Sequence, residues 1–152
     1  MGKIASDRAV DTLQLLNVAL QDHKKKYKDS PLNSIDGIFI SEERDTPGKF
    51  LVRSLEGPIA TFSLQELVGC CGVLVSYWSE VIPDYRKKGI GTDLLVIRMA
   101  TARAMKYGLC LATVDQSNKT EVTLLLSQGW NKLREFRNPR TNNIIEIYSI
   151  NL

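Results

Sequence analysis

The sequence has little of what a disulfide-stapled or zinc-binding protein requires. Only three of its 152 residues are cysteines and one is a histidine. Cys70 and Cys71 are adjacent, so in a strand they point to opposite faces and cannot easily pair. The single histidine, His23, lies in a lysine run, and we therefore expect no metal site. An odd number of cysteines without metal-ligand spacing is typical of a reducing compartment.

Long apolar runs are also missing. No stretch approaches the roughly 18 consecutive apolar residues that a membrane-spanning helix needs. Charged residues (Asp7, Arg8 and Asp11) interrupt the N-terminal segment, which therefore does not resemble a secretory signal. These two absences predict a cytoplasmic protein without a membrane partner.

The composition is that of a globular protein with a core: 43% of the residues are hydrophobic and 24% are charged. The length of 152 residues fits one ordinary domain, and no repeat, low-complexity tract or linker divides it. We therefore expect a single domain over residues 1–152. The net charge of +3 is mild and favours anionic partners only slightly. Basic residues gather at 24–28, 86–88 and 132–140, but aromatic residues hardly interleave with them, which disfavours nucleic-acid binding.

Hydrophobic periodicity predicts an α/β fold. Leu13, Leu16 and Leu20 recur at helical spacing in the first segment. Three strand candidates follow, at residues 35–40, 50–55 and 72–81, with Gly57-Pro58 as a turn and residues 59–67 ambiguous between strand and irregular structure.

The second half contains the clearest helix, over residues 90–107, apolar on most of its surface and ended by Gly108. A short apolar strand follows at 109–114. A strand, a helix and a strand in tight succession form a βαβ unit, so strands 72–81 and 109–114 should be parallel neighbours. A short helix at 120–127, ended by Gly129, and a hairpin of strands 132–136 and 144–150 complete the chain.

A glycine-rich basic loop lies between the strand ending near residue 81 and the long helix. It reads Arg86-Lys87-Lys88-Gly89-Ile90-Gly91. Glycines without Cβ atoms allow an anion to approach the main chain closely. The first N–H groups of the following helix have no intrahelical partner, and the helix dipole is positive there. We interpret this loop as a pyrophosphate-binding site.

Two other phosphate-binding loops do not fit these residues. A P-loop has four residues between its glycines and a Lys-Ser/Thr pair after the second one. A Rossmann loop has a third glycine and an acidic residue at the end of the next strand. Asp115 occupies that last position, but the glycine spacing is wrong.

The segment around the loop resembles the central motif of the GNAT family, the acyl-CoA-dependent N-acetyltransferases. That motif is Arg or Gln, two residues, Gly, one residue, then Gly or Ala, after a strand that ends in an apolar-x-Pro pattern. The matching residues are Val81-Ile82-Pro83-Asp84-Tyr85-Arg86-Lys87-Lys88-Gly89-Ile90-Gly91-Thr92. Downstream, Asn118 and the pair Gly129-Trp130 resemble the asparagine and the Gly-aromatic pair of the family. The resemblance covers about half of the chain, from residue 72 onward.

This resemblance implies a single-domain GNAT-like α/β fold. Its mixed, mostly antiparallel sheet would have a central parallel βαβ unit with splayed strands, flanked by helices. The implied co-substrate is acetyl-CoA. Its pyrophosphate would lie on the main-chain N–H groups of Lys87, Lys88, Gly89, Ile90, Gly91 and Thr92, near Arg86, and its pantetheine arm beside Val81 and Asn118. Asn118 is at least as well explained as a helix N-cap, which does not exclude the contact.

Acyl transfer to an amine also needs a base, because only the free amine attacks a thioester. Glu80 and Tyr77 are our candidates, since bases in this family often come from that strand. Strict alternation places Tyr77, Ser79 and Val81 on one face and Trp78 and Glu80 on the other. A bulge, which the family often has there, would change the facing near Glu80.

The general acid usual in this family is absent. Alignment on Asn118 and Gly129-Trp130 places the tyrosine that protonates the leaving thiolate at Leu125, which cannot donate a proton. Ser127, Tyr77 and Cys110 are substitutes that we do not rank. The sequence therefore predicts an N-acetyltransferase that uses an unidentified amine. A GNAT-fold protein that binds CoA without catalysis and a nucleic-acid-directed modifier are the alternatives. A homodimer would be usual for the family.

Overall fold

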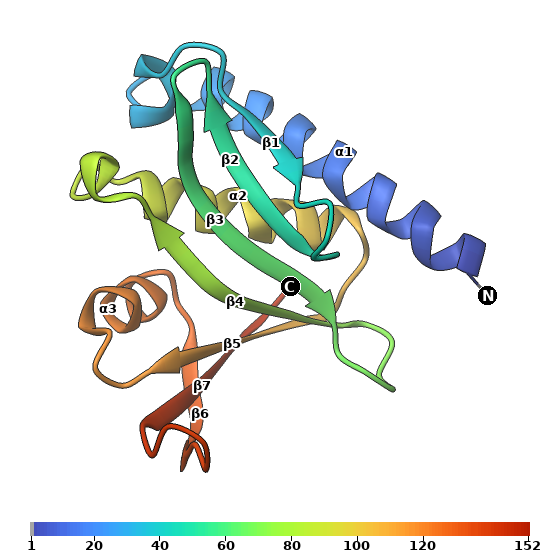
Figure 1. Ribbon diagram of the computed structural model, residues 1–152, viewed down its shortest axis with the longest axis vertical. Helices are drawn as coiled ribbons and strands as arrows, with labels where there is room; N and C mark the ends of the chain where they lie inside the picture. Colours follow the sequence, from blue (N-terminus) through green and yellow to red (C-terminus); the bar gives the residue numbers. More distant parts are fainter. Residues whose placement is uncertain (1) are drawn as a thin grey trace.

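A computed structural model gives the protein a seven-stranded sheet with helices packed against it (Figure 1). The structure describes the backbone of residues 2–152 and the side chains of residues 11–152. The strand order is β1-β2-β3-β4-β5-β7-β6, and only the β4–β5 pair is parallel. The elements are α1 (Gly2–Lys26), η1 (Pro31–Ser34), β1 (Phe39–Glu42), β2 (Lys49–Ser54), β3 (Gly57–Glu66), β4 (Val73–Val81), η2 (Pro83–Tyr85), α2 (Ile90–Ala104), β5 (Leu109–Asp115), α3 (Lys119–Ser127), β6 (Asn131–Arg137) and β7 (Ile144–Asn151).

The core lies between the sheet and the helices α1 and α2, which run behind the sheet in Figure 1. Leu16 and Leu20 of α1 are fully buried, as the periodicity predicted. Across the core, the rings of Phe50 and Phe62 pack 5.6 Å apart on β2 and β3. None of the helices in the described part of the chain combines the length and the apolarity needed to cross a lipid bilayer.

Three element boundaries differ from the sequence prediction. The first strand lies at Phe39–Glu42 instead of residues 35–40, and β3 starts at Gly57, where a turn was predicted. The helix α2 ends three residues early, at Ala104, and Lys106 rather than Gly108 takes the left-handed conformation (φ 67°). Gly108 is not the cap because its N–H already donates to the carbonyl oxygen of Gly72, at the start of the β4–β5 pairing.

The parallel strands β4 and β5 pair over only half of their length. Their register runs from Val73↔Leu109 to Ser76↔Ala112 and stops there. Beyond this point β4 continues against β3, and β5 continues against β7. Figure 1 shows the two strands diverging toward α3 and the loop before α2. The predicted parallel βαβ unit with splayed strands is therefore confirmed.

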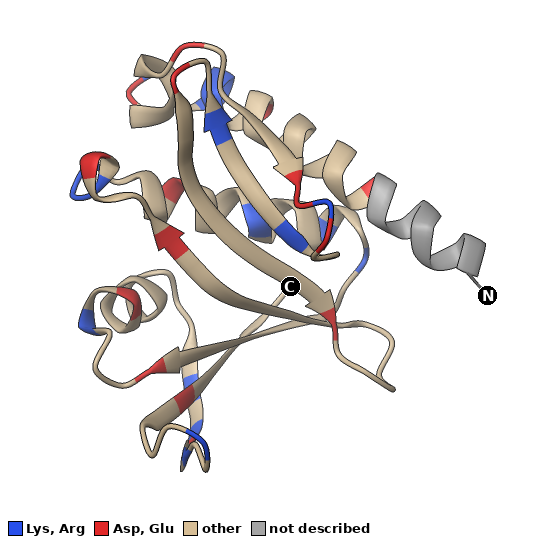
Figure 2. Cartoon of the chain, in the orientation of Figure 1, with Lys and Arg blue, Asp and Glu red and all other residues tan. Residues whose placement is uncertain are grey.

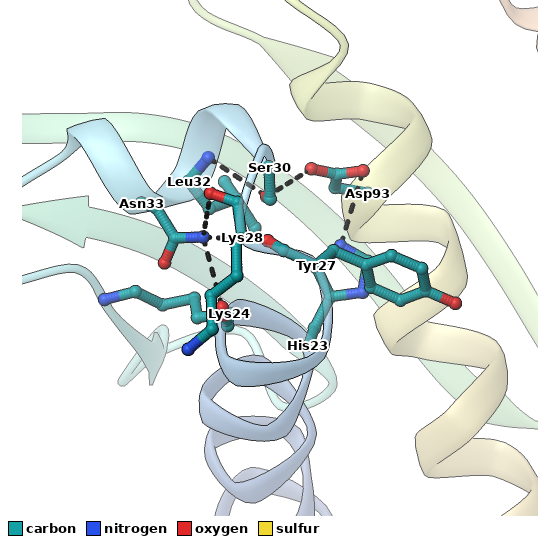
Figure 3. A network of polar contacts seen from close by, with 8 residues as sticks. All are labelled: His23, Lys24, Tyr27, Lys28, Ser30, Leu32, Asn33 and Asp93. Carbon is teal, nitrogen blue, oxygen red and sulfur yellow. Dashed lines mark hydrogen bonds and ion pairs between the residues drawn. The ribbon is translucent and has the colours of Figure 1, made fainter.

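A buried polar network fixes the N-terminal end of α2 to the end of α1 (Figure 3). The Ser30 hydroxyl donates to Asp93 Oδ2 at 2.6 Å, and His23 Nε2 lies 3.4 Å from Asp93 Oδ1. Ser30 also caps η1 by accepting the N–H of Leu32. His23 adjoins the lysine run of the sequence, yet only 8% of its surface is exposed. The carboxylate in the first turn of α2 therefore has two partners from the segment at the end of α1.

Replacing Asp93 with alanine should destabilise the protein by about 1–3 kcal/mol, since a buried hydroxyl and an imidazole lose their partner. The free energy of unfolding, measured in urea, checks this expectation. Asp22→Ala removes an exposed carboxylate from the same end of α1 and serves as the control. Equal losses in the two variants would contradict a stabilising role of the network.

Candidate functional site

The loop before α2 presents a continuous row of free main-chain N–H groups. Arg86 N–H donates to the Pro83 carbonyl, and Asp93 N–H donates to the Gly89 carbonyl. Between them, none of the six N–H groups of residues 87–92 donates to another group among the described residues. Lys87 (φ 62°) and Gly89 (φ 86°) both take the left-handed conformation, which curves the backbone around these donors.

The two glycines keep the approach to these donors open. A Cβ at Gly89 would meet only Pro31 Cγ, at 3.9 Å, so this side of the loop is exposed. A Cβ at Gly91 would lie 3.8 Å from both Val81 and Leu124, which places the loop between the end of β4 and α3. The loop and the N-terminal end of α2 therefore form a concave set of donors that an anion can reach.

Positive charge surrounds this set of donors. Figure 2 shows basic residues in the loop, and a second basic group on β6 and its hairpin. Lys87 and Lys88 are exposed, with Lys88 Nζ 5.6 Å from the centre of the Tyr85 ring. Together with the dipole of the fifteen-residue helix α2, these side chains favour a multiply charged anion.

Arg86 turns from the loop back to the end of β4. Its Nε donates to the Val81 carbonyl at 2.7 Å, and its Nη2 lies 3.4 Å from Glu80 Oε1. Both side chains of this ion pair are more than half exposed. Arg86 thus connects two predicted sites, the phosphate loop and the strand that carries the base candidates.

Asn118 is the N-cap of α3, the alternative that the sequence had left open for this residue. Its Oδ1 accepts the Glu121 N–H at 3.2 Å. The residue is exposed, and its side-chain amide group donates to no described residue. The cap therefore leaves the donor side of Asn118 free for a ligand.

A β-bulge in β4 corrects the predicted facing of the base candidates. Thr61 pairs with Glu80 and Ser63 pairs with Tyr77, so one residue of β3 faces two of β4. Since Thr61 and Ser63 share a face, Tyr77 and Glu80 do too. Strict alternation, which placed them on opposite faces, was wrong for this pair, and the bulge that the family resemblance implied is present. The extra residue of the bulge lies between Tyr77 and Glu80, and there Trp78 takes a φ of 51°.

The other face of the bulge carries a buried arginine that the sequence analysis missed. Arg98 of α2 is only 2% exposed, and its Nη1 donates to the hydroxyl oxygens of Ser76 and Ser79 at 2.6 Å each. Its guanidinium carbon lies 5.0 Å from the centre of the Phe62 ring. No carboxylate within the described residues forms an ion pair with it. Burial lowers the pKa of Arg98, because the charged form loses its hydration.

The sequence does contain one signal for the burial of Arg98, namely its position in an otherwise apolar helix. Arg98 follows Leu94 by four residues and therefore lies on the same helical face, toward the sheet. A single arginine on a buried helical face requires polar partners on the neighbouring element. The sequence shows the arginine but not which hydroxyl groups meet it.

The position of the usual acid is part of the core. Leu125 is 1% exposed, so this position of α3 supplies packing. Ser127 donates its hydroxyl to the Leu124 carbonyl of its own helix at 2.7 Å. Burial raises the pKa of the Cys110 thiol to about 12, although the charge of Arg98 and a hydrogen bond with the Ser76 backbone lower it in part. This thiol therefore remains protonated. Among the three substitutes, Tyr77 alone is part-exposed at the bulge.

Glu121 is a second titratable residue that the sequence analysis passed over. It lies in the first turn of α3, one turn before Leu125. Burial raises the pKa of its carboxyl group, and the positive charge of Arg98 partly opposes this shift. Glu121 follows the cap Asn118 by three residues, a spacing that marks the start of a helix in the sequence. Its burial, by contrast, depends on how α3 packs.

Comparison with known proteins adds the fold family. The sequence matches no protein-family profile, and none of the curated proteins matches it. Solved structures do match. Arabidopsis thaliana Naa50, in complex with the bisubstrate analogue CoA-Ac-MVNAL, has a TM-score of 0.63 at 13% identity, over 76% of this chain and 99% of its own.

Two bacterial proteins match as well. The Escherichia coli ribosomal-protein-S18-alanine N-acetyltransferase has a TM-score of 0.58 at 19% identity, over 68% of this chain and 67% of its own. A GNAT-family acetyltransferase from Bacillus anthracis has a TM-score of 0.60 at 15% identity, over 68% and 66%. The chain therefore has the GNAT fold, as predicted: α/β, with a mostly antiparallel sheet and one parallel pair.

Proposed function

We propose that the protein is an N-acyltransferase that moves an acetyl group from acetyl-CoA to a primary amine. The observation that carries this proposal is the row of six free N–H groups over residues 87–92, on a GNAT fold. An anion with two linked phosphates can accept from several of these donors at once. A fold neighbour that holds a CoA-containing analogue supports the same assignment. The whole of residues 1–152 would then form one acyl-CoA-binding domain.

The residues around the loop fit a CoA molecule. The main chain of Lys87 to Thr92 would bind the pyrophosphate, with the lysine side chains and Arg86 adding positive charge. The pantetheine arm would follow the end of β4, where Val81 lies beside the loop and Asn118 offers its amide group from α3. The thioester would then lie where β4 and β5 diverge, next to the bulge.

The chemistry requires one proton transfer before the attack and one after it. In this proposal Glu80 accepts a proton from the acceptor ammonium, directly or through water, and Tyr77 on the same face is the second candidate. The amine nitrogen then bonds to the acyl carbon, and the carbon–sulfur bond breaks. The thiolate of CoA leaves and takes up a proton.

The buried Leu125 favours a second candidate function. A GNAT-fold protein that binds CoA without transferring its acyl group needs no acid in α3. A thiolate is, however, a better leaving group than an alkoxide, so transfer without a dedicated acid is chemically reasonable. Glu121, one turn earlier on α3, is a half-buried carboxyl group.

Release of free CoA thiol tests the proposal. Purified protein, acetyl-CoA and a panel of primary amines should release thiol at a rate that depends on both substrates. Glu80→Gln should lower this rate by about 100-fold, since general-base catalysis contributes roughly 100- to 10,000-fold. Binding of acetyl-CoA with no amine-dependent release would instead establish the non-catalytic alternative. No thermal shift with acetyl-CoA would overturn both.

A further inference from the structure

Trp78 is held in an unfavourable conformation on the surface. Its φ of 51° is rare for a bulky residue. Its side chain is 71% exposed, so neither burial nor core packing compensates for the strain. Strained backbone that persists in a folded protein often marks a functional site.

A buried hydrogen-bond donor meets the strained segment from the side of α2. A single nitrogen of Arg98, Nη1, donates to the hydroxyl groups of both Ser76 and Ser79. Tyr77 keeps its regular pairing with Ser63, so the extra residue of the bulge lies at Trp78 and Ser79. The fold therefore buries a charged side chain, which is costly, and this side chain joins the strand before the bulge to the bulge itself.

Around the bulge, β4 presents an aromatic and acidic surface made of Tyr77, Trp78 and Glu80. The rings of Tyr77 and Trp78 contact each other edge to face, with centroids 5.1 Å apart. Glu80 shares the face of Tyr77, and its Oε2 has no partner among the described residues. No other exposed large hydrophobic residue belongs to β3 or β4 within the described chain. A single exposed indole on the strand that also carries Glu80 suits a cation better than an apolar partner.

We propose that Trp78 binds the acceptor and that this acceptor carries two amino groups, one that reacts and one that remains protonated over the indole ring. This inference rests on the proposed function for the reacting group. The face of Trp attracts an ammonium ion more strongly than the other aromatic rings do. Trp78 is then a specificity residue, and Arg98 is the positioning residue that holds it.

Two matched probes separate this proposal from its alternatives. We would compare 1,5-diaminopentane with pentylamine, which have the same chain length and differ by one charged group. The diamine should have a KM lower by about fivefold, the size expected of an exposed cation–π contact. Trp78→Asn, which removes the ring and tolerates the left-handed conformation, should abolish this preference. Trp78→Phe should retain part of it.

Fluorescence provides a readout that is independent of acyl transfer. The protein has two tryptophans, and Trp130 is only 2% exposed. The diamine should change the emission of the wild-type protein and leave that of Trp78→Asn unchanged. An emission change without thiol release would preserve the acceptor site and reject the transferase proposal.

A different pair of results would reject the acceptor site alone. Thiol release at the same KM for both amines, with no emission change, would overturn the acceptor site and leave the transferase proposal standing. A preference for pentylamine that Trp78→Asn removes would show that the ring acts as an apolar surface, which also overturns the proposal.

Discussion

Replacing Gly89 with glutamate is expected to weaken acetyl-CoA binding by at least about 100-fold, and to abolish the increase in melting temperature expected of the wild-type protein with acetyl-CoA. The carboxylate would stand beside the free N–H groups, where the pyrophosphate is proposed to bind. Two like charges about 4 Å apart near a protein surface repel each other by roughly 4 kcal/mol. Thermal shift and equilibrium binding of acetyl-CoA measure the effect.

Gly69 provides a matched control for this substitution. Both glycines have a positive φ, 86° at Gly89 and 76° at Gly69, and neither would meet another atom closely through an added Cβ. Gly69→Glu therefore introduces the same backbone strain and the same charge, but in the loop between β3 and β4. Equal loss of binding in the two variants would show that strain, and not the anion site, causes the effect.

Replacing Arg98 with methionine is expected to lower kcat about 10- to 100-fold while acetyl-CoA binding changes little. The guanidinium holds Ser76 and Ser79 at the bulge, and without it Trp78 and the adjacent β4 backbone can relax. A displacement of about 1 Å at a reacting group can cost roughly 100-fold in rate. The hydrogen bonds of Arg98 go to Leu94, Ser76 and Ser79 and not to the loop before α2, so the affinity for acetyl-CoA should persist.

Steady-state kinetics and direct binding distinguish this role from simple loss of stability. Arg103→Met changes an exposed arginine on the same helix and is the control. The double variant Ser76→Ala/Ser79→Ala removes the partners of Arg98 instead. It should likewise lower kcat and leave the affinity for acetyl-CoA nearly unchanged. A parallel loss of acetyl-CoA binding in Arg98→Met would mean that the arginine stabilises the whole fold and does not specifically position the bulge.

Much of the fold follows from local sequence features. The apolar helix at α2, the strands on either side of it and the left-handed Gly129 after α3 are set by periodicity and by residue type within a few positions. The cap Asn118 is equally local, because its side chain reaches an N–H three residues later. Such features depend on short-range hydrogen bonds, so the residues themselves indicate them.

Interactions between distant segments could not be predicted from local sequence features. His23 and Asp93 are seventy positions apart, and only the packing of α1 against α2 brings them together. Gly108 was predicted to cap α2 by its residue type, but its N–H is used by the strand pairing with Gly72. A local rule failed here because a tertiary hydrogen bond competed for the same group.

The base candidates show the limit most clearly. Sequence identified Tyr77 and Glu80, but alternation put them on opposite faces, and only the register of β4 against β3 places them together. At the same place Arg98 donates to Ser76 and Ser79, contacts that join two elements about twenty residues apart. No short-range pattern in β4 contains that information.

By itself the sequence predicted a phosphate loop, since glycines, basic residues and a helix start are all contained in six consecutive positions. It also determined the order of the helices and strands around that loop. The tertiary structure alone decided that six N–H groups remain free there, that β4 and β5 part after four paired residues, and that a bulge turns Tyr77 and Glu80 to one face. These features depend on strand register and on a buried charge from another element, which a linear pattern does not specify.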